Sequence, residues 1–140
     1  MDRDAREFGD ALARVSRAVK AAAGEAMREL GLHPGQNFIL DELWREDALT
    51  PGELARRIGI EVPTVTRATQ RMESAGLVKR IPDDTDARLV RVRLTERGSA
   101  MREQLPPILE RVYNDALAPL AADERRALVA LLMRVARTHR

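Results

Sequence analysis

The chain has 140 residues, which is enough for one domain with its own hydrophobic core. Aromatic residues make up only 3% of it and the net charge is +2, so aliphatic side chains must fill the core and no strong overall charge indicates a nucleic-acid partner. The absence of cysteine excludes disulfides, thiol redox sensing and cysteine-ligated zinc, and two histidines are too few for a histidine-rich metal site, so we expect no metal or other cofactor. A charged N-terminus and the lack of an apolar run of membrane-spanning length predict a cytoplasmic chain.

The first 45 residues predict two helices. Apolar residues recur at steps of three and four from Asp4 to Leu30, which indicates one amphipathic helix about 40 Å long. This is longer than a compact domain of this size needs, so we expect it to pack on a second subunit. Glycine and proline in the segment 31–35 end it, and a second helix is expected from Gly35 to Arg45. The apolar side of this second helix carries Phe38, Ile39, Leu43 and Trp44.

The next segment predicts a helix-turn-helix. Thr50–Glu53 reads as a capping box with proline at the first helical position, which opens a short helix through Ile58, and a fourth helix is expected from Val62 to Ala75. Ala55 is small where the helices cross, Gly59 permits the positive φ of the turn, and Val65 fills the wedge between them. The rest of this small core is expected from Leu54, Ile58, Ile60 and Met72.

The opposite face of the fourth helix is polar. Hydroxyl, amide and guanidinium groups there are the types that contact phosphates and base edges in a major groove. A solvated polar face is the alternative interpretation. The residues of this face are Pro63, Thr64, Thr66, Arg67, Gln70 and Arg71.

A β-hairpin follows directly. Strands are expected at 77–81 and 90–94, joined by a segment rich in turn formers. Asp86 and Arg88 are two residues apart, so on an extended wing they point the same way and the carboxylate can hold the guanidinium. Such an arginine suits the negative potential of a minor groove, whereas a surface ion pair of little energetic value is the alternative. Asp83, Asp84 and Asp86 suggest either a cation site or turn chemistry, of which we favour turn chemistry.

The last third predicts two more helices. Thr95 is a candidate N-cap for a helix that continues to about Leu117, and Pro106-Pro107 should interrupt and kink it. The final helix begins at Asp123-Glu124. Together with the first helix it offers more apolar surface than one small domain covers, so we expect a homodimer. The apolar residues of the final helix are Leu128, Leu131, Leu132 and Val135. The predicted fold is mainly α: a winged helix-turn-helix with a two-stranded wing, flanked by long terminal helices.

Two motifs resemble the multiple-antibiotic-resistance regulator (MarR) family. The run L-T-P-G-E-L-A-R-R-I-G-I-E-V-P-T-V-T-R is similar to that family's helix-turn-helix, and D-A-R-L-V-R-V-R-L-T matches its wing signature D-x-R-x-x-x-V-x-L-T. The resemblance covers essentially the whole chain. It implies a single domain over residues 1–140, with a DNA-binding lobe at about 36–95 and dimerisation helices at about 1–32 and 96–140. It also implies a homodimeric transcription factor, usually a repressor, that inserts each wing arginine into a minor groove of a pseudo-palindromic operator.

Two features depart from that family or extend it. Many relatives carry a basic or amide residue before the recognition-helix proline, whereas this chain has Val62, which can touch a thymine methyl but cannot hydrogen-bond a base. Relatives often bind small organic effectors, some of them aromatic acids, between the dimer helices and the DNA-binding lobe. A cleft near His33, Phe38, Trp44 and Met101 is the candidate effector site here. The alternative interpretation places Phe38 and Trp44 in the core and His33 at a loop cap.

The sequence therefore predicts a double-stranded-DNA-binding transcriptional regulator rather than an enzyme. No nucleophile–base pair and no glycine-rich phosphate loop is present. Two alternatives stay open: a winged-helix module that mediates protein contact without specific DNA binding, and an enzyme of small-molecule metabolism. Salt-dependent DNA binding discriminates the first, and a screen for turnover discriminates the second.

Overall fold

The computed structural model describes residues 1–139, so Arg140, the last residue of the expected C-terminal dimerisation segment, lies outside the described residues. Six helices and one two-stranded sheet form within this range, as the predicted mainly α winged helix requires. Their bounds in chain order are α1 (Arg3–Arg28), α2 (Gln36–Arg45), α3 (Pro51–Ile58), α4 (Val62–Ser74), β1 (Val78–Pro82), β2 (Val90–Leu94), α5 (Glu96–Leu117) and α6 (Ala122–Arg137).

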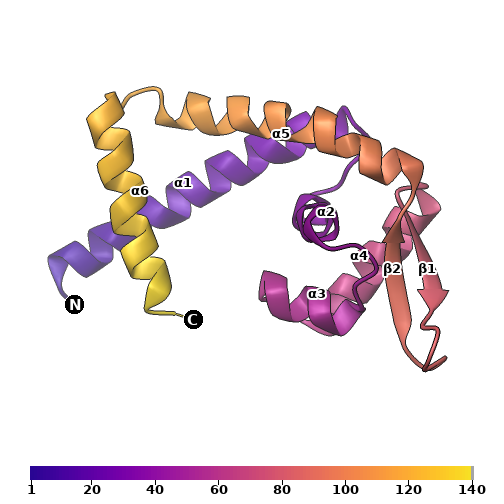
Figure 1. Cartoon of the computed structure of the whole chain (residues 1–140). Coiled ribbons are helices and arrows are strands. Elements are labelled where there is room, and N and C mark those ends of the chain that lie inside the picture. Colours follow the sequence, from indigo (N-terminus) through magenta and orange to yellow (C-terminus); the bar gives the residue numbers. More distant parts are fainter. Residues whose placement is uncertain (140) are drawn as a thin grey trace.

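The molecule is elongated, with its two ends joined by α5 (Figure 1). The compact lobe of α2, α3, α4 and the hairpin lies at one end, and α6 lies at the other with both chain termini. Helix α1 runs back towards the lobe and packs against α5, where its residues Gly24 and Met27 are buried. In contrast, no residue of α6 is buried. The two ends therefore differ in kind: one has a core, and the other presents uncovered helix faces.

The hydrophobic core lies in the lobe and along the first half of α5. The side chains of Leu40, Leu54 and Val65 are fully enclosed, which shows that α2, α3 and α4 pack around one centre. Leu77 and Val92 extend this core to the wing, and Met101 and Leu105 extend it to α5. Burial of aliphatic side chains, each worth about 1.5–3 kcal/mol, stabilises this lobe.

Hydroxyl caps begin two of the helices. The Thr50 hydroxyl accepts a hydrogen bond from the Glu53 N–H at 3.1 Å, but no return bond from Glu53 forms within the described chain, so only half of the predicted capping box is present. Thr95 is the N-cap of α5 as predicted, because its hydroxyl accepts from the Gly98 N–H at 3.1 Å. The same hydroxyl donates to the Gly76 carbonyl at 2.6 Å. This second bond ties the start of α5 to the turn that follows α4.

The structure corrects two expectations about side-chain environment. Ile60 is 40% exposed rather than part of the helix-turn-helix core. Gly59 ends α3 with a φ of +82°, and this turn carries Ile60 outside the wedge between α3 and α4. Phe38 was grouped with the core face of α2, yet it is 53% exposed, because Ile39, Leu40 and Leu43 occupy the buried side of that helix.

The expected interruption of the helix at Pro106-Pro107 was wrong. Helix α5 continues through both prolines to Leu117. Each proline lacks the N–H that would bond the carbonyl four residues earlier, so Arg102 and Glu103 lose their usual helical donors. Both prolines are exposed, so water can hydrate those carbonyls and the helical dihedrals persist.

Candidate nucleic-acid interface

The exposed face of α4 carries the predicted polar residues. Val65, Thr69 and Met72 are buried against the rest of the lobe, which orients the opposite face of the helix outward. The Thr69 hydroxyl donates to the Thr66 carbonyl at 3.1 Å, so it is satisfied inside the helix. Of the predicted contact residues, Thr66 is half-buried and the others are exposed: Val62, Pro63, Thr64, Arg67, Gln70 and Arg71.

The helix-turn-helix geometry follows the predicted spacing. Ala55 is 4% exposed and Val65 is fully buried, as expected for the crossing point and the wedge. The positive φ of Gly59 reverses the chain between the two helices, a conformation that favours glycine. Helix α4 begins without a side-chain cap, because its N-cap residue Glu61 forms no such bond. Within the described chain, Pro63 has no N–H and the Thr64 N–H donates to the Glu61 carbonyl at 3.1 Å, so in the first turn of α4 only the Val62 N–H is left for a phosphate.

The turn of the wing is organised by Asp83. One of its carboxylate oxygens accepts hydrogen bonds from the Thr85 N–H at 3.1 Å, the Thr85 hydroxyl at 2.7 Å and the Asp86 N–H at 3.0 Å. The other oxygen accepts from the Arg91 guanidinium. This arrangement confirms turn chemistry for Asp83.

Asp86 and Arg88 form the predicted pair at the wing tip. The guanidinium donates from Nε to one carboxylate oxygen of Asp86 at 3.0 Å and from Nη2 to the other at 3.2 Å. The expected reason, alternation along an extended strand, was wrong. The Leu89 N–H bonds the Asp86 carbonyl at 3.0 Å, so these residues form a turn, and the Arg88 N–H also donates to the Asp86 carboxylate at 3.1 Å. A local turn therefore sets the direction of Arg88.

Hydrogen bonds lower the pKa of both carboxylates. The Arg91 guanidinium, followed by the bonds from Thr85 and Asp86, holds the pKa of Asp83 far below its usual range. The Arg88 guanidinium and N–H likewise lower the pKa of Asp86. Asp83 and Asp86 are therefore both negatively charged around neutral pH.

Contacts that sequence reasoning missed attach the wing to the lobe. Arg91 Nη1 donates to the Ala48 carbonyl at 2.8 Å, and the Leu94 N–H donates to the Asp47 carboxylate at 2.9 Å. The Val92 N–H bonds the Leu49 carbonyl at 2.8 Å in an isolated bridge. The two residues of each contact are more than 40 positions apart in the chain, so no local sequence pattern predicts these contacts.

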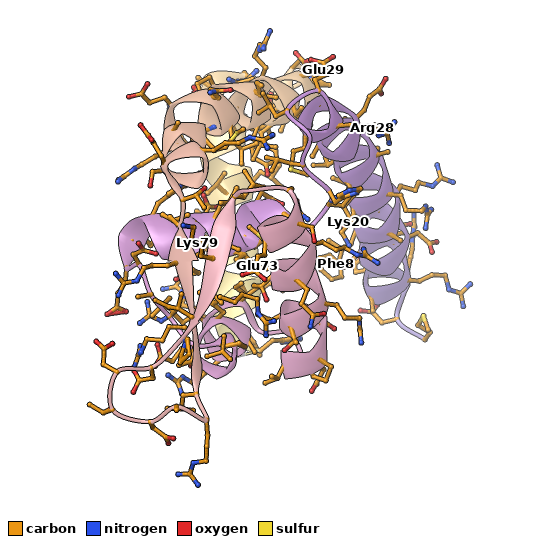
Figure 2. The ribbon with its side chains drawn as sticks, turned by 90° about the vertical axis from the view of Figure 1, so that its right-hand side faces the viewer. Phe8, Lys20, Arg28, Glu29, Glu73 and Lys79 are labelled. Atoms are coloured by element: carbon orange, nitrogen blue, oxygen red, sulfur yellow. The ribbon has the colours of Figure 1, made fainter. Side chains whose placement is uncertain are left out.

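A further contact attaches the other strand of the wing to the recognition helix. The carboxylate of Glu73, on α4, accepts from the Arg80 N–H of β1 at 2.7 Å. Figure 2 shows Glu73 and the neighbouring strand residue Lys79 on the same side of the molecule, with the hairpin tip extending beyond the lobe. Both strands are thus anchored, and the tip with Arg88 projects from a fixed base.

The four candidate effector residues do not surround one cavity. Met101 is 5% exposed and belongs to the core, and His33 lies on the surface. Trp44 is half-buried and donates from its indole N–H to the Gly98 carbonyl at 3.0 Å, which fastens α2 to the start of α5. Of the four, only Phe38 lines an open cavity of about 300 Å³ between α2 and α5.

A model of the MarR family matches residues 32–90. PecS of Dickeya dadantii, an HTH-type transcriptional regulator, is 32% identical to the chain over 129 residues, which cover 89% of this chain and 76% of PecS. The chain belongs to the MarR family. YdgJ of Bacillus subtilis, an uncharacterised HTH-type transcriptional regulator, is 31% identical and covers 75% of this chain, while the chain spans only 64% of YdgJ.

Solved structures of the MarR family share the fold. A mutant of MarR from E. coli, complexed with operator DNA, superposes with a TM-score of 0.84 at 27% identity, covering 96% of this chain and 99% of that one. A MarR transcriptional regulator from Methanosarcina mazei Go1 gives a TM-score of 0.86 at 25% identity, covering 96% of each chain. These likenesses place the chain among DNA-binding transcription regulators and not among enzymes. None of the helices over residues 1–139 is long and apolar enough to cross a membrane.

Proposed function

We propose that the chain is a sequence-specific regulator that places α4 in a major groove and Arg88 in the adjacent minor groove. The observation that carries this proposal is the oriented guanidinium at the wing tip: the Arg88 side chain is 91% exposed, yet Asp86 holds it by two bonds. A pair this exposed contributes little to folding. Asp86 occupies two of the five N–H donors of Arg88, which leaves three for phosphates or base edges. On α4, Arg67 and Arg71 supply further exposed positive charge.

The proposal includes a homodimer. Phe8, Leu12 and Val15 on α1 are each about half exposed, and Leu128 and Leu132 on α6 are 37% and 43% exposed. These five side chains line a wholly apolar cavity of about 200 Å³ between α1 and α6. Contiguous apolar surface of this kind marks an interaction site, and a second copy offers the same surface to cover it.

A homodimer of this kind binds two half-sites. Half-sites one helical turn apart, about 34–36 Å, follow for two symmetric helix-turn-helix lobes, so the operator is pseudo-palindromic. Binding at such an operator blocks transcription, and a small organic ligand that disfavours the required lobe spacing releases it. The resemblance to MarR relatives supports the repressor role, and the open cavity between α2 and α5 supports the ligand.

The test begins with selection of a binding sequence from randomised duplexes, followed by titrations at several salt concentrations. Binding should weaken steeply with salt, because each phosphate contact releases counterions. Arg88→Ala should weaken specific binding by about 1–3 kcal/mol, and Asp86→Ala should cause part of that loss by releasing the guanidinium. Arg111→Ala, which removes an exposed arginine from α5, is the matched control and should change little.

Two results would contradict the proposal. An unchanged dissociation constant for Arg88→Ala, with circular dichroism showing an intact fold, excludes the wing contact. Failure to enrich any duplex at low salt favours the alternative, a winged helix used for protein contact.

A further inference from the structure

The charged residues that line the open cavity between α2 and α5 are all acidic. Its apolar floor is formed by Leu105 and Leu109 of α5, which are 1% and 8% exposed. Asp41 of α2 and Glu110 of α5 stand at its sides, and none of its lining residues is basic. At about 300 Å³ the cavity is at the small end of the range for organic ligands.

Neither carboxylate of this cavity is neutralised by the chain. Within residues 1–139, Asp41 and Glu110 form no ion pair. The nearest cation on α2, Arg45, bonds Glu42 at 3.2 Å, and Arg57 pairs with Glu42 and Glu46. Burial raises the pKa of Asp41 above its ordinary value, and Glu42 adds to this while Arg45 opposes it. Asp41 is thus a partly desolvated carboxylate that forms no ion pair. Arg45 and Arg57 line the neighbouring cavity with Asp41, but both bond the carboxylates of Glu42 or Glu46.

An uncharged amide also lines the cavity. Asn37 is only 5% exposed as a residue. The only buried side-chain nitrogen or oxygen without a hydrogen-bond partner in residues 1–139 is Arg80 Nε, so the Asn37 amide is open to water from the cavity side. It is therefore available to hydrogen-bond a polar group of a ligand.

Two aromatic rings complete the wall. Phe38 from α2 and Tyr113 from α5 line the cavity and are 53% and 43% exposed. Aromatic faces attract organic cations through the ring quadrupole, and the attraction is stronger where water is excluded. Both the rings and the carboxylates favour positive charge and disfavour an aromatic acid.

We infer that this cavity binds a small organic cation, an amine or quaternary ammonium group with an apolar body, between Phe38 and Tyr113 and beside Asp41 and Glu110. The apolar body contacts the Leu105 floor, and the Asn37 amide accepts or donates a hydrogen bond at the wall.

The position of the cavity gives the ligand a means of regulation, a point that rests on the proposed function. Helix α2 belongs to the DNA-binding lobe, while α5 continues to the far end of the molecule (Figure 1). A ligand wedged between them favours one angle of the lobe to α5 and so one spacing of the two lobes of a dimer. Its effect on DNA affinity can be no larger than its preference between the two arrangements.

The experiment measures ligand binding by calorimetry on the full chain, without DNA. The probes are benzylamine, benzyltrimethylammonium and phenethyltrimethylammonium, with benzyl alcohol as the neutral analogue and benzoate as the anion. We expect the cations to bind at least about tenfold more tightly than benzyl alcohol and benzoate to bind weakest, because a charge-assisted hydrogen bond changes affinity by about one order of magnitude or more. The Asp41→Asn/Glu110→Gln double variant should lose most of this preference for cations over the neutral analogue. Phe38→Ala should weaken the binding of every cation.

The matched control is the same carboxylate-to-amide substitution at another position of α5. Glu103→Gln removes an exposed carboxylate that does not line the cavity, and it should leave cation binding unchanged. Tighter binding of benzoate than of the cations, equal cation binding by the double variant, or no binding of any cation at millimolar concentration would overturn the inference.

A second measurement separates this inference from the proposed function. The selected duplex is titrated with and without saturating benzyltrimethylammonium. Release of DNA supports regulation through the cavity, and cation binding that leaves the DNA affinity unchanged overturns the regulatory part. A chain that binds the cations but no DNA overturns the proposed function alone.

Discussion

Gly98 is the position where adding one methyl group should damage the lobe most. It is the third residue of α5, and a Cβ built there would overlap the Leu77 carbonyl oxygen and lie 3.2 Å from a methyl of Leu94. Real Cβ atoms essentially never approach another atom that closely, and the atom in question is backbone. In Gly98→Ala the start of α5 must therefore move away from the wing.

The size of the effect follows from the bonds at that contact. The Thr95 N–H bonds the Leu77 carbonyl at 3.0 Å, and the Trp44 indole bonds the Gly98 carbonyl at 3.0 Å. Weakening two hydrogen bonds costs about 0.5–1.5 kcal/mol each, and overpacking costs about 1–3 kcal/mol. Alanine gains only about 1 kcal/mol over glycine inside a helix. The net expectation is a loss of about 1–5 kcal/mol in the free energy of unfolding.

Urea unfolding followed by circular dichroism, at one protein concentration, measures this loss. The control is Gly52→Ala in α3, where the nearest atom to the added Cβ is 3.9 Å away and φ is ordinary. That variant should gain about 0.4–1 kcal/mol by restricting the unfolded chain. If Gly98→Ala were as stable as the parent while Gly52→Ala behaved as expected, the close packing of α5 on the wing would be refuted.

Three further predictions concern the dimer, the wing and a helix cap. Leu132→Glu places a charge in the apolar cavity between α1 and α6, and truncation after Leu120 removes that surface altogether. Light scattering of either variant should therefore show monomer or aggregate at micromolar concentration. A folded, DNA-binding monomer of the parent chain would contradict this. Because folding lowers the pKa of Asp83 from 3.8, its contribution to stability is present above that pH and is lost as the pH falls below it. Asp83→Asn should therefore flatten the decline of the urea midpoint as the pH falls from about 5 to about 3, the range in which an unfolded aspartate takes up its proton, and an unaltered decline would exclude this linkage. Thr50→Ala should cost about 1 kcal/mol by removing the cap of α3, whereas a cost near zero in thermal melts would show that water replaces the hydroxyl.

The helix-turn-helix could be predicted because its determinants are local. Ala55, Gly59 and Val65 each act over one or two turns of helix, and the structure places all three as their spacing indicated. The same holds for the Thr95 cap. Pairing of Asp86 with Arg88 was also predictable from two nearby residues, although a turn and not a strand produces it.

Contacts between residues far apart in the chain could not be predicted from hydropathy periodicity. Phe38 and Trp44 occupy the same helix, and hydropathy puts both on its apolar side. Packing of the lobe leaves Phe38 at the wall of a cavity with Tyr113, and turns Trp44 towards the Gly98 carbonyl. The partner in each case is on α5, more than 50 residues later in the chain, so the sequence around α2 does not predict either environment.

The sequence by itself determined the winged helix, its turn residues and the identity of the exposed groups on α4 and the wing tip, because these depend on periodicity and on contacts within a few residues. The tertiary structure decided how the wing is held, through Arg91 and the Ala48 carbonyl, and which carboxylates line the same cavity, Asp41 and Glu110. Those relations depend on how separate elements pack, and packing is a property of the whole chain.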